Sequence, residues 1–147
     1  MGVGKQHIDF FTLQDHIGAD TRSDLLFKAA LKDRARAAYY GLTRVGLEAT
    51  NADANQQNRN LILSETAKAD SDPVLEILTS NIIRCSHGAT AGPVDQEQLF
   101  YLQARGIPYK AAEALLVRAF LGQVLDQVPG EDLREELATI IDRKLSA

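Results

Sequence analysis

Cysteine is almost absent from this 147-residue sequence, tryptophan is missing altogether, and proline occurs only four times. The single cysteine, Cys85, excludes an internal disulfide and therefore a disulfide-stapled secreted domain; we expect a reducing, cytoplasmic location. One thiol is also too few for a self-sufficient iron–sulfur cluster, because such clusters need about four protein ligands, most of them thiolates. Any cluster on this chain would have to be shared with a second polypeptide.

Long apolar runs and an excess of basic charge are missing too. The sequence has no run of about 20 apolar residues that could span a bilayer. It also shows no charged segment followed by an apolar one, the pattern of a secretory signal peptide. Its formal net charge of -4 argues against a duplex nucleic-acid binder, which needs a basic face. The local basic run of Lys28, Lys32, Arg34 and Arg36 is expected to be a solvated edge. A content of 45% hydrophobic residues predicts a globular unit with its own core.

Short runs typical of β-strands, separated by polar turns, fill the first 90 residues. In DLLFKAALK the alternation predicts one buried and one mostly solvated face. The polar stretches NADANQQNRN and DSDP are expected to be breaks between strands. Without crossover helices, a sandwich, a barrel and a solenoid all remain compatible with the pattern. The expected strands are Gln6 to Leu13, Asp24 to Leu31, Ala37 to Val45, Arg59 to Ser64, Val74 to Leu78 and Ile82 to His87.

After Pro93 the apolar period becomes that of helices. Asp95 is a plausible N-cap with Gln98 in the capping-box position, and Gly106 suits the left-handed residue that ends a helix. Pro108 is expected to open a second helix. A third is expected from Glu131 to about Leu145, after Pro129-Gly130. The chain therefore reads as a β half followed by a helical part.

Cys85 and His87 are the first candidates for chemistry. Side chains alternate along a strand, so the two residues share a face, which we expect to point inward. From the pattern alone, Cys85 reads as a small buried hydrophobe and His87 as a partner of a nearby backbone carbonyl. A lone Cys-x-His pair lacks the several ligands that a metal site requires.

His7, Asp9 and His16 form a second candidate group. Two histidines and a carboxylate could bind zinc or iron, whereas hydrogen bonds to turns would explain the same residues more simply. With His87 added, this group is the basis of an alternative function, a metal-dependent β-fold enzyme. No phosphate loop, nucleophile elbow or dinucleotide fingerprint occurs.

The run DPVLEILTSNIIRCSHGATAGPVDQEQLFYLQARGIPYKAAEALLVRAFL resembles the C-terminal part of the SufB/SufD family of iron–sulfur assembly proteins, and most of all its D-type subunit. The motifs CSHGAT and LFYLQARGI are the most specific. Upstream, QHIDFFTLQDH and NQQNRNLILSETA are also similar, so the resemblance covers nearly the whole chain. Family members are considerably longer, which implies a C-terminal fragment.

The resemblance implies a fold that is mainly β with α: a right-handed parallel β-helix over residues 1–92, followed by a helical domain over residues 93–147. It also implies that the Asn/Gln-rich stretch at residues 55–60 forms a solenoid corner. B-type relatives have a cysteine proposed as a cluster ligand at the place of Ala67, and glutamate at the place of Gly88. Both departures favour the D-type assignment.

The function implied by the resemblance is that of a non-catalytic scaffold without a cofactor of its own. His87, and with less weight Cys85, would lie at the interface with the SufB-type subunit, where a transient iron–sulfur cluster is shared. The SufC ATPase, which binds the ATP, would dock on the helical part. An exposed sheet edge also allows the isolated chain to form a homodimer, and no nucleic-acid or membrane partner is expected. The expected docking residues are Leu99, Phe100, Tyr101, Leu102, Arg105, Gly106, Ile107 and Pro108.

Overall fold

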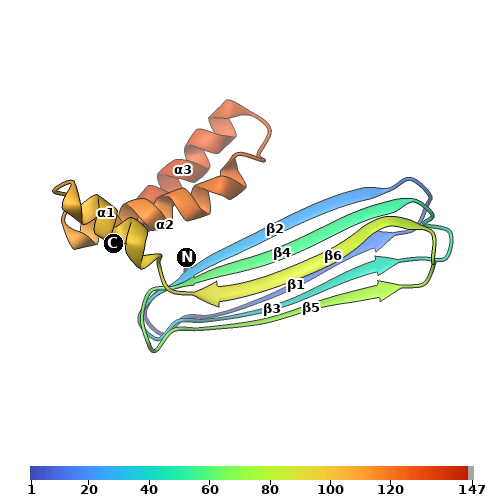
Figure 1. Ribbon diagram of the computed structural model, residues 1–147, viewed down its shortest axis with the longest axis horizontal. Coiled ribbons are helices and arrows are strands. Elements are labelled where there is room, and N and C mark those ends of the chain that lie inside the picture. The colour runs from blue at the N-terminus through green and yellow to red at the C-terminus, as the bar shows by residue number, and fades with distance from the viewer. Residues whose placement is uncertain (146–147) are drawn as a thin grey trace.

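The computed structural model describes residues 1–145, which form six β-strands followed by three α-helices (Figure 1). All the expected strands and helices are present, and the strands are longer than expected. The strands are β1 (His7–His16), β2 (Arg22–Leu31), β3 (Arg36–Val45), β4 (Ala52–Ile62), β5 (Lys68–Ile77) and β6 (Ile82–Gly92). The helices are α1 (Gln96–Ala104), α2 (Tyr109–Leu125) and α3 (Glu131–Leu145).

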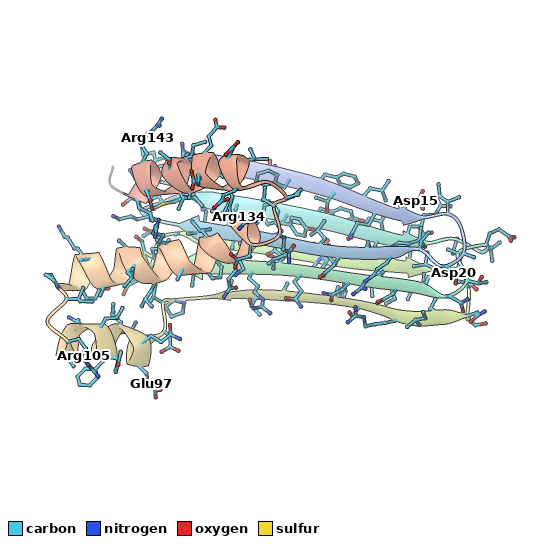
Figure 2. All side chains as sticks on the ribbon, turned by 90° about the horizontal axis from the view of Figure 1, so that it is seen from above. Asp15, Asp20, Glu97, Arg105, Arg134 and Arg143 are labelled. Atoms are coloured by element: carbon cyan, nitrogen blue, oxygen red, sulfur yellow. The ribbon has the colours of Figure 1, made fainter. Side chains whose placement is uncertain are left out.

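Successive strands alternate between two parallel sheets. One sheet has the order β1-β3-β5 and the other β2-β4-β6, and every neighbouring pair is parallel. The chain therefore winds back and forth between two facing layers, with the helices gathered at one end (Figure 1). Figure 2 places Asp15 and Asp20 at the opposite end, where β1 turns into β2. None of the three helices in the described part of the chain has the length and apolar character needed to traverse a bilayer.

Stacked polar side chains hold successive windings in register. Asn55 Nδ2 donates to Asp24 Oδ1 at 2.8 Å, and Ser86 Oγ donates to Asn55 Oδ1 at 3.0 Å; successive partners are 31 positions apart in the sequence. At the far-end turns, Asn51 Nδ2 donates to Asp20 Oδ1 at 3.0 Å. Asp20 and Asn51 both have positive φ, which short polar side chains tolerate better than most residues. One polar corner of the winding therefore lies at these turns.

The prediction of a break or corner at NADANQQNRN is wrong, because most of this stretch is β4, the central strand of its sheet. Gln56 and Asn58 are fully buried between the sheets. Gln56 Nε2 donates to Tyr39 Oη at 3.0 Å, and the Thr43 hydroxyl donates to Gln56 Oε1 at 2.9 Å. Amide side chains are depleted in strands in general, but here the opposite sheet supplies partners for Gln56 and for Asn58 Oδ1, which accepts from the Ser71 hydroxyl at 2.8 Å. DSDP likewise lies within β5, an edge strand, where proline is tolerated.

The expectation of a mostly solvated face on β2 is also wrong. Leu31 packs inside with Ala35, Ala37 and Ala67, whereas Ala30 on the outer face packs with Val94, Val117 and Leu121. Lys28 does not belong to a solvated edge, because its amine donates to the Phe120 carbonyl oxygen at 2.9 Å and lies 4.2 Å from the Phe120 ring centre. Helix α2 therefore covers part of this sheet. Exposure of Lys32, Arg34 and Arg36 agrees with the expected edge.

The helix ends follow the capping signals in the sequence. Asp95 Oδ1 accepts hydrogen bonds from the backbone N–H groups of Glu97 (2.9 Å) and Gln98 (3.1 Å). Gly106 has a φ of 86° just after α1, and α2 begins directly after Pro108. Satisfied terminal N–H groups and a left-handed exit fix where α1 begins and ends.

His16 is 4% exposed and points between the sheets at the far end of β1. Its Nδ1 lies 2.7 Å from Thr21 Oγ1, and the Thr21 hydroxyl already donates to the Gly18 carbonyl at 3.1 Å. Thr21 Oγ1 must therefore accept a hydrogen bond from the Nδ1–H group of His16. The Nε2 atom of His16 lies 2.7 Å from Ser23 Oγ and accepts a hydrogen bond from that hydroxyl.

Neutral His16 is therefore expected to be the Nδ1–H tautomer, the less common form of free histidine side chains. Two-bond ¹⁵N–¹H correlation spectra of the imidazole nitrogens measure this directly. Exposed His7 is the control, since no such hydroxyl pair surrounds it. An Nε2–H pattern for His16 would contradict the hydrogen-bond assignment.

The absence of a side chain at Gly41 makes room for the hydrogen bonds of the Gln56 amide. A Cβ at this position would stand 1.8 Å from Gln56 Nε2 and 2.4 Å from Tyr39 Oη. Substitution Gly41→Ala is expected to destabilise the fold by about 2–4 kcal/mol, because it overpacks the interior and displaces buried hydrogen bonds. Urea unfolding measures the loss. Gly92→Ala is the control, since its Cβ would meet nothing within 4 Å; equal effects of the two substitutions would disprove the prediction.

Candidate functional site

Cys85 and His87 lie on the inward face of β6, as the alternation predicts. In the parallel register Cys85 is the partner of Ala54, and His87 is the partner of Gln56. Both β4 partners are fully buried between the sheets. Leu25 of β2, Gln56 and His87 therefore form one row across the sheet, and His87 ends this row at the edge.

The two candidate side chains have different surroundings. Cys85 is half-buried against the cluster of Val45, Ala49 and Ala52, and burial raises the pKa of its thiol above the usual value. His87 is exposed, and no residue in the range 1–145 forms a hydrogen bond with its ring. The backbone-carbonyl partner expected for His87 is therefore not formed. The site pairs a neutral, sheltered thiol with an accessible imidazole, a group able to ligate iron or carry a proton near neutral pH.

The edge that carries His87 is open and partly apolar. Within the described residues, no strand pairs with the outer edge of β5 or of β6. Ile83 is 72% exposed beside this edge, and Ile77 and Leu78 are exposed as well. Unpaired backbone groups beside exposed apolar side chains are typical of a surface that a second polypeptide covers.

The second candidate group is not assembled. His7 Nε2 lies 2.9 Å from Asp9 Oδ1 on the outer face of the β1-β3-β5 sheet. His16 points inward and is bonded to two hydroxyls, and His87 lies in the other sheet. Within residues 1–145 no three His, Cys, Asp or Glu side chains gather closely enough to hold a metal ion. The contacts seen at His7, Asp9 and His16 are structural.

The expected docking residues on the helices divide into two groups. Leu99 is only 2% exposed and belongs to the interior, whereas Phe100 and Tyr101 are 72% and 58% exposed. The Arg105 guanidinium lies 5.1 Å from the Tyr101 ring centre, which orients both side chains at the end of α1. Figure 2 shows Glu97 on α1 and Arg105 at its C-terminal cap, beyond the end of the sheets.

A hollow of about 470 Å³ lies beside these residues, between α1 and α2. Leu102 and Tyr101 of α1 line it together with Leu115, Leu116 and Ala119 of α2. Leu102 and Ile107 are half-buried, and Gly106 and Pro108 are exposed in the link to α2. The accessible part of the expected set is therefore an aromatic and apolar surface next to a groove.

Lys28 has a structural role that the sequence pattern did not predict. It joins β2 to α2 through the Phe120 carbonyl and also donates to the side-chain oxygen of Gln123. The sequence feature that could have predicted this role is the single cation inside the apolar run LLFKAAL. In such a run a cation calls for a specific acceptor.

Comparison with known proteins identifies the family. Residues 1–120 match the model of the SUF system FeS cluster assembly, SufBD core domain. The chain is 37% identical over 147 aligned residues to an iron–sulfur cluster assembly SufBD family protein of Mycobacterium bovis, covering 95% of this chain and 37% of the relative. It is 34% identical to the iron–sulfur cluster assembly protein SufD of Bacillus subtilis and 33% identical to that of Escherichia coli, in each case over 99% of this chain.

These alignments take up 33% and 34% of the two SufD proteins, so the chain spans about a third of the length of the curated relatives it matches. The domain match covers more than half of the chain, and the identity to the relatives extends across strands and helices alike. The chain belongs to the SufBD family of iron–sulfur cluster assembly proteins, with SufD proteins among its relatives.

Proposed function

We propose that this chain is a non-catalytic, cytoplasmic scaffold in iron–sulfur cluster assembly, and that His87 and Cys85 contribute to a site completed by a SufB-type subunit. The observation that carries the proposal is their shared inward face on an open edge strand, with the imidazole accessible. One thiol and one imidazole are too few to hold a cluster. The cluster is the cargo of the assembly, and the second subunit supplies the other ligands.

The β part, residues 1–92, serves in this proposal as the C-terminal rungs of a right-handed parallel β-helix. Alternate pairing of strands in two parallel sheets and short connecting turns support it. Residues 93–147 act as the helical domain, of which residues 146 and 147 lie outside the described residues. In the intact protein, further rungs would precede the first winding seen here.

The SufB-type subunit pairs, in this proposal, with the β5 and β6 edge. Backbone groups along the edge offer strand addition, and Ile77 and Ile83 offer apolar contact beside His87. In the absence of that partner, a second copy of this chain can occupy the same edge and form a homodimer.

The SufC ATPase docks, in this proposal, on the surface formed by Phe100, Tyr101, Ile107 and Pro108. The neighbouring hollow between α1 and α2 would accept apolar side chains of the ATPase. Leu99 supports this surface from inside, and Arg105 fixes the Tyr101 ring. ATP binds to the partner, and hydrolysis moves the helices relative to the cluster-assembly edge. Lys28 transmits this motion, because it joins α2 to the sheet that carries His87.

Replacing His87 by alanine in the reconstituted complex with the SufB-type subunit and the ATPase tests the assembly role. The yield of cluster is expected to fall about tenfold, because the site loses a ligand or proton carrier. Binding of the ATPase is expected to stay unchanged, since His87 lies on β6 and the proposed docking surface lies on α1 and the link to α2. Iron and sulfide analysis gives the yield, and calorimetry gives the docking affinity.

His7→Ala is the matched control, because His7 is also exposed but lies on the other sheet. A normal cluster yield in the His87→Ala complex would refute a role for this residue. A full complement of iron and sulfide on the purified chain without partners would refute the shared site itself.

Lys28→Met tests the transmission of motion from the helices. Methionine keeps an apolar stem but removes the bonds to Phe120 and Gln123, and we expect a loss of about 1–2 kcal/mol in stability. The ATP-dependent change in the modification rate of His87 by diethyl pyrocarbonate should become at least about threefold smaller. Lys32→Met is the control, since exposed Lys32 has no side-chain bond within residues 1–145. An unaltered ATP response in the Lys28 variant would contradict the proposed path.

A further inference from the structure

A second hollow on the β2-β4-β6 sheet is lined mostly by outward-facing residues of β4 and β6, together with Asn58 and His87. It measures about 320 Å³ and lies between β4 and β6. Gly88 leaves it open, because a Cβ built there meets no atom within 4 Å. Gln57 is the register partner of Gly88, and Arg59 is the register partner of Thr90. Gln57, Arg59 and Thr90 therefore surround one vacant side-chain position.

Arg59 lies next to another cation. Lys28 of β2 is its register partner on the other side, so two like charges stand directly opposite each other in neighbouring strands. Such a pair is destabilising unless each charge finds a counter-charge or acceptor. Lys28 is turned toward the Phe120 carbonyl of α2, and burial together with the Arg59 charge lowers its pKa below the usual value. Arg59 forms no hydrogen bond or ion pair within residues 1–145.

The carboxylates on this face are already engaged. Asp24 accepts from Asn55 Nδ2 at 2.8 Å, and Asp53 accepts from Arg84 Nε at 2.8 Å and lies 3.6 Å from Arg22 Nε. No acidic side chain lines the hollow. The hollow therefore contains a positive charge and hydrogen-bond donors, and no negatively charged side chain lines it.

We propose that this hollow binds a phosphate group. The guanidinium fork of Arg59 would bind two phosphate oxygens, and the Thr90 hydroxyl and Gln57 amide would bind the others. Ser86 does not take part as a donor, because its hydroxyl donates to Asn55 at 3.0 Å. A carboxylate would leave part of this donor set unused, which favours the phosphate with its larger number of acceptor oxygens. His87 also lines this hollow, but the proposal does not rest on cluster assembly, because its test uses the chain without iron, sulfide or a partner subunit.

Both inorganic phosphate and the phosphate of a nucleotide carry this chemistry. Titration of the ¹⁵N-labelled chain with inorganic phosphate, and separately with AMP, at constant ionic strength distinguishes them. We expect saturable amide shifts at Gln57, Gly88 and Thr90 with either probe. Similar affinities would identify free phosphate as sufficient, whereas tighter binding of AMP would identify a nucleotide as the natural source.

Three variants make the assignment specific. Arg59→Gln is expected to weaken phosphate binding about tenfold or more, since a charge-assisted pair is lost. Gly88→Ala is expected to weaken binding without lowering the melting temperature, because its Cβ occupies free space. Arg44→Gln removes an arginine that faces Glu76 on the other sheet and should leave the affinity unchanged. Absence of saturable shifts at the hollow, or equal affinities of Arg59→Gln and the unmodified chain, would overturn the proposal.

Discussion

The side chain of Gln56 spans the space between two parallel sheets, and the arrangement of the strands depends on the bonds that it makes there. Its amide is fully buried and binds Tyr39 and Thr43 of the facing sheet. A buried amide without partners costs about 1–3 kcal/mol, so a shift of register would be penalised at this residue as well as at the apolar contacts. Gly41 provides the room that the Gln56 amide occupies.

The same row explains why His87 is exposed. Gln56 and His87 occupy equivalent inward positions one winding apart, yet the first is buried and the second exposed. Their exposure differs because Gln56 has a strand on each side, whereas the strand of His87 ends the sheet. The open edge therefore leaves backbone groups unpaired and makes an inward position accessible, as the proposed pairing with a second subunit requires.

Cations on the outer face of this sheet show how neighbouring elements decide the role of a residue. Lys28 and Arg59 are register partners with the same charge. Helix α2 supplies acceptors for Lys28 and so links the helices to the sheet. Arg59, one strand further from that contact, faces the hollow that Gly88 leaves open. This row of the sheet thus contains Lys28, which links the sheet to α2, and Arg59, which lies at a candidate anion site.

The sequence by itself determined the order of six strands and three helices, the caps at Asp95 and Gly106, and the common face of Cys85 and His87, because periodicity and capping act over a few residues. It also carried the motifs by which the family is identified. Only the tertiary structure decided that residues 52–62 form a central strand, because isolated amides favour turns and become compatible with a strand when a facing sheet binds them. It likewise decided that His16 is structural, and that Lys28 and Arg59 have different surroundings, since each depends on residues distant in the chain.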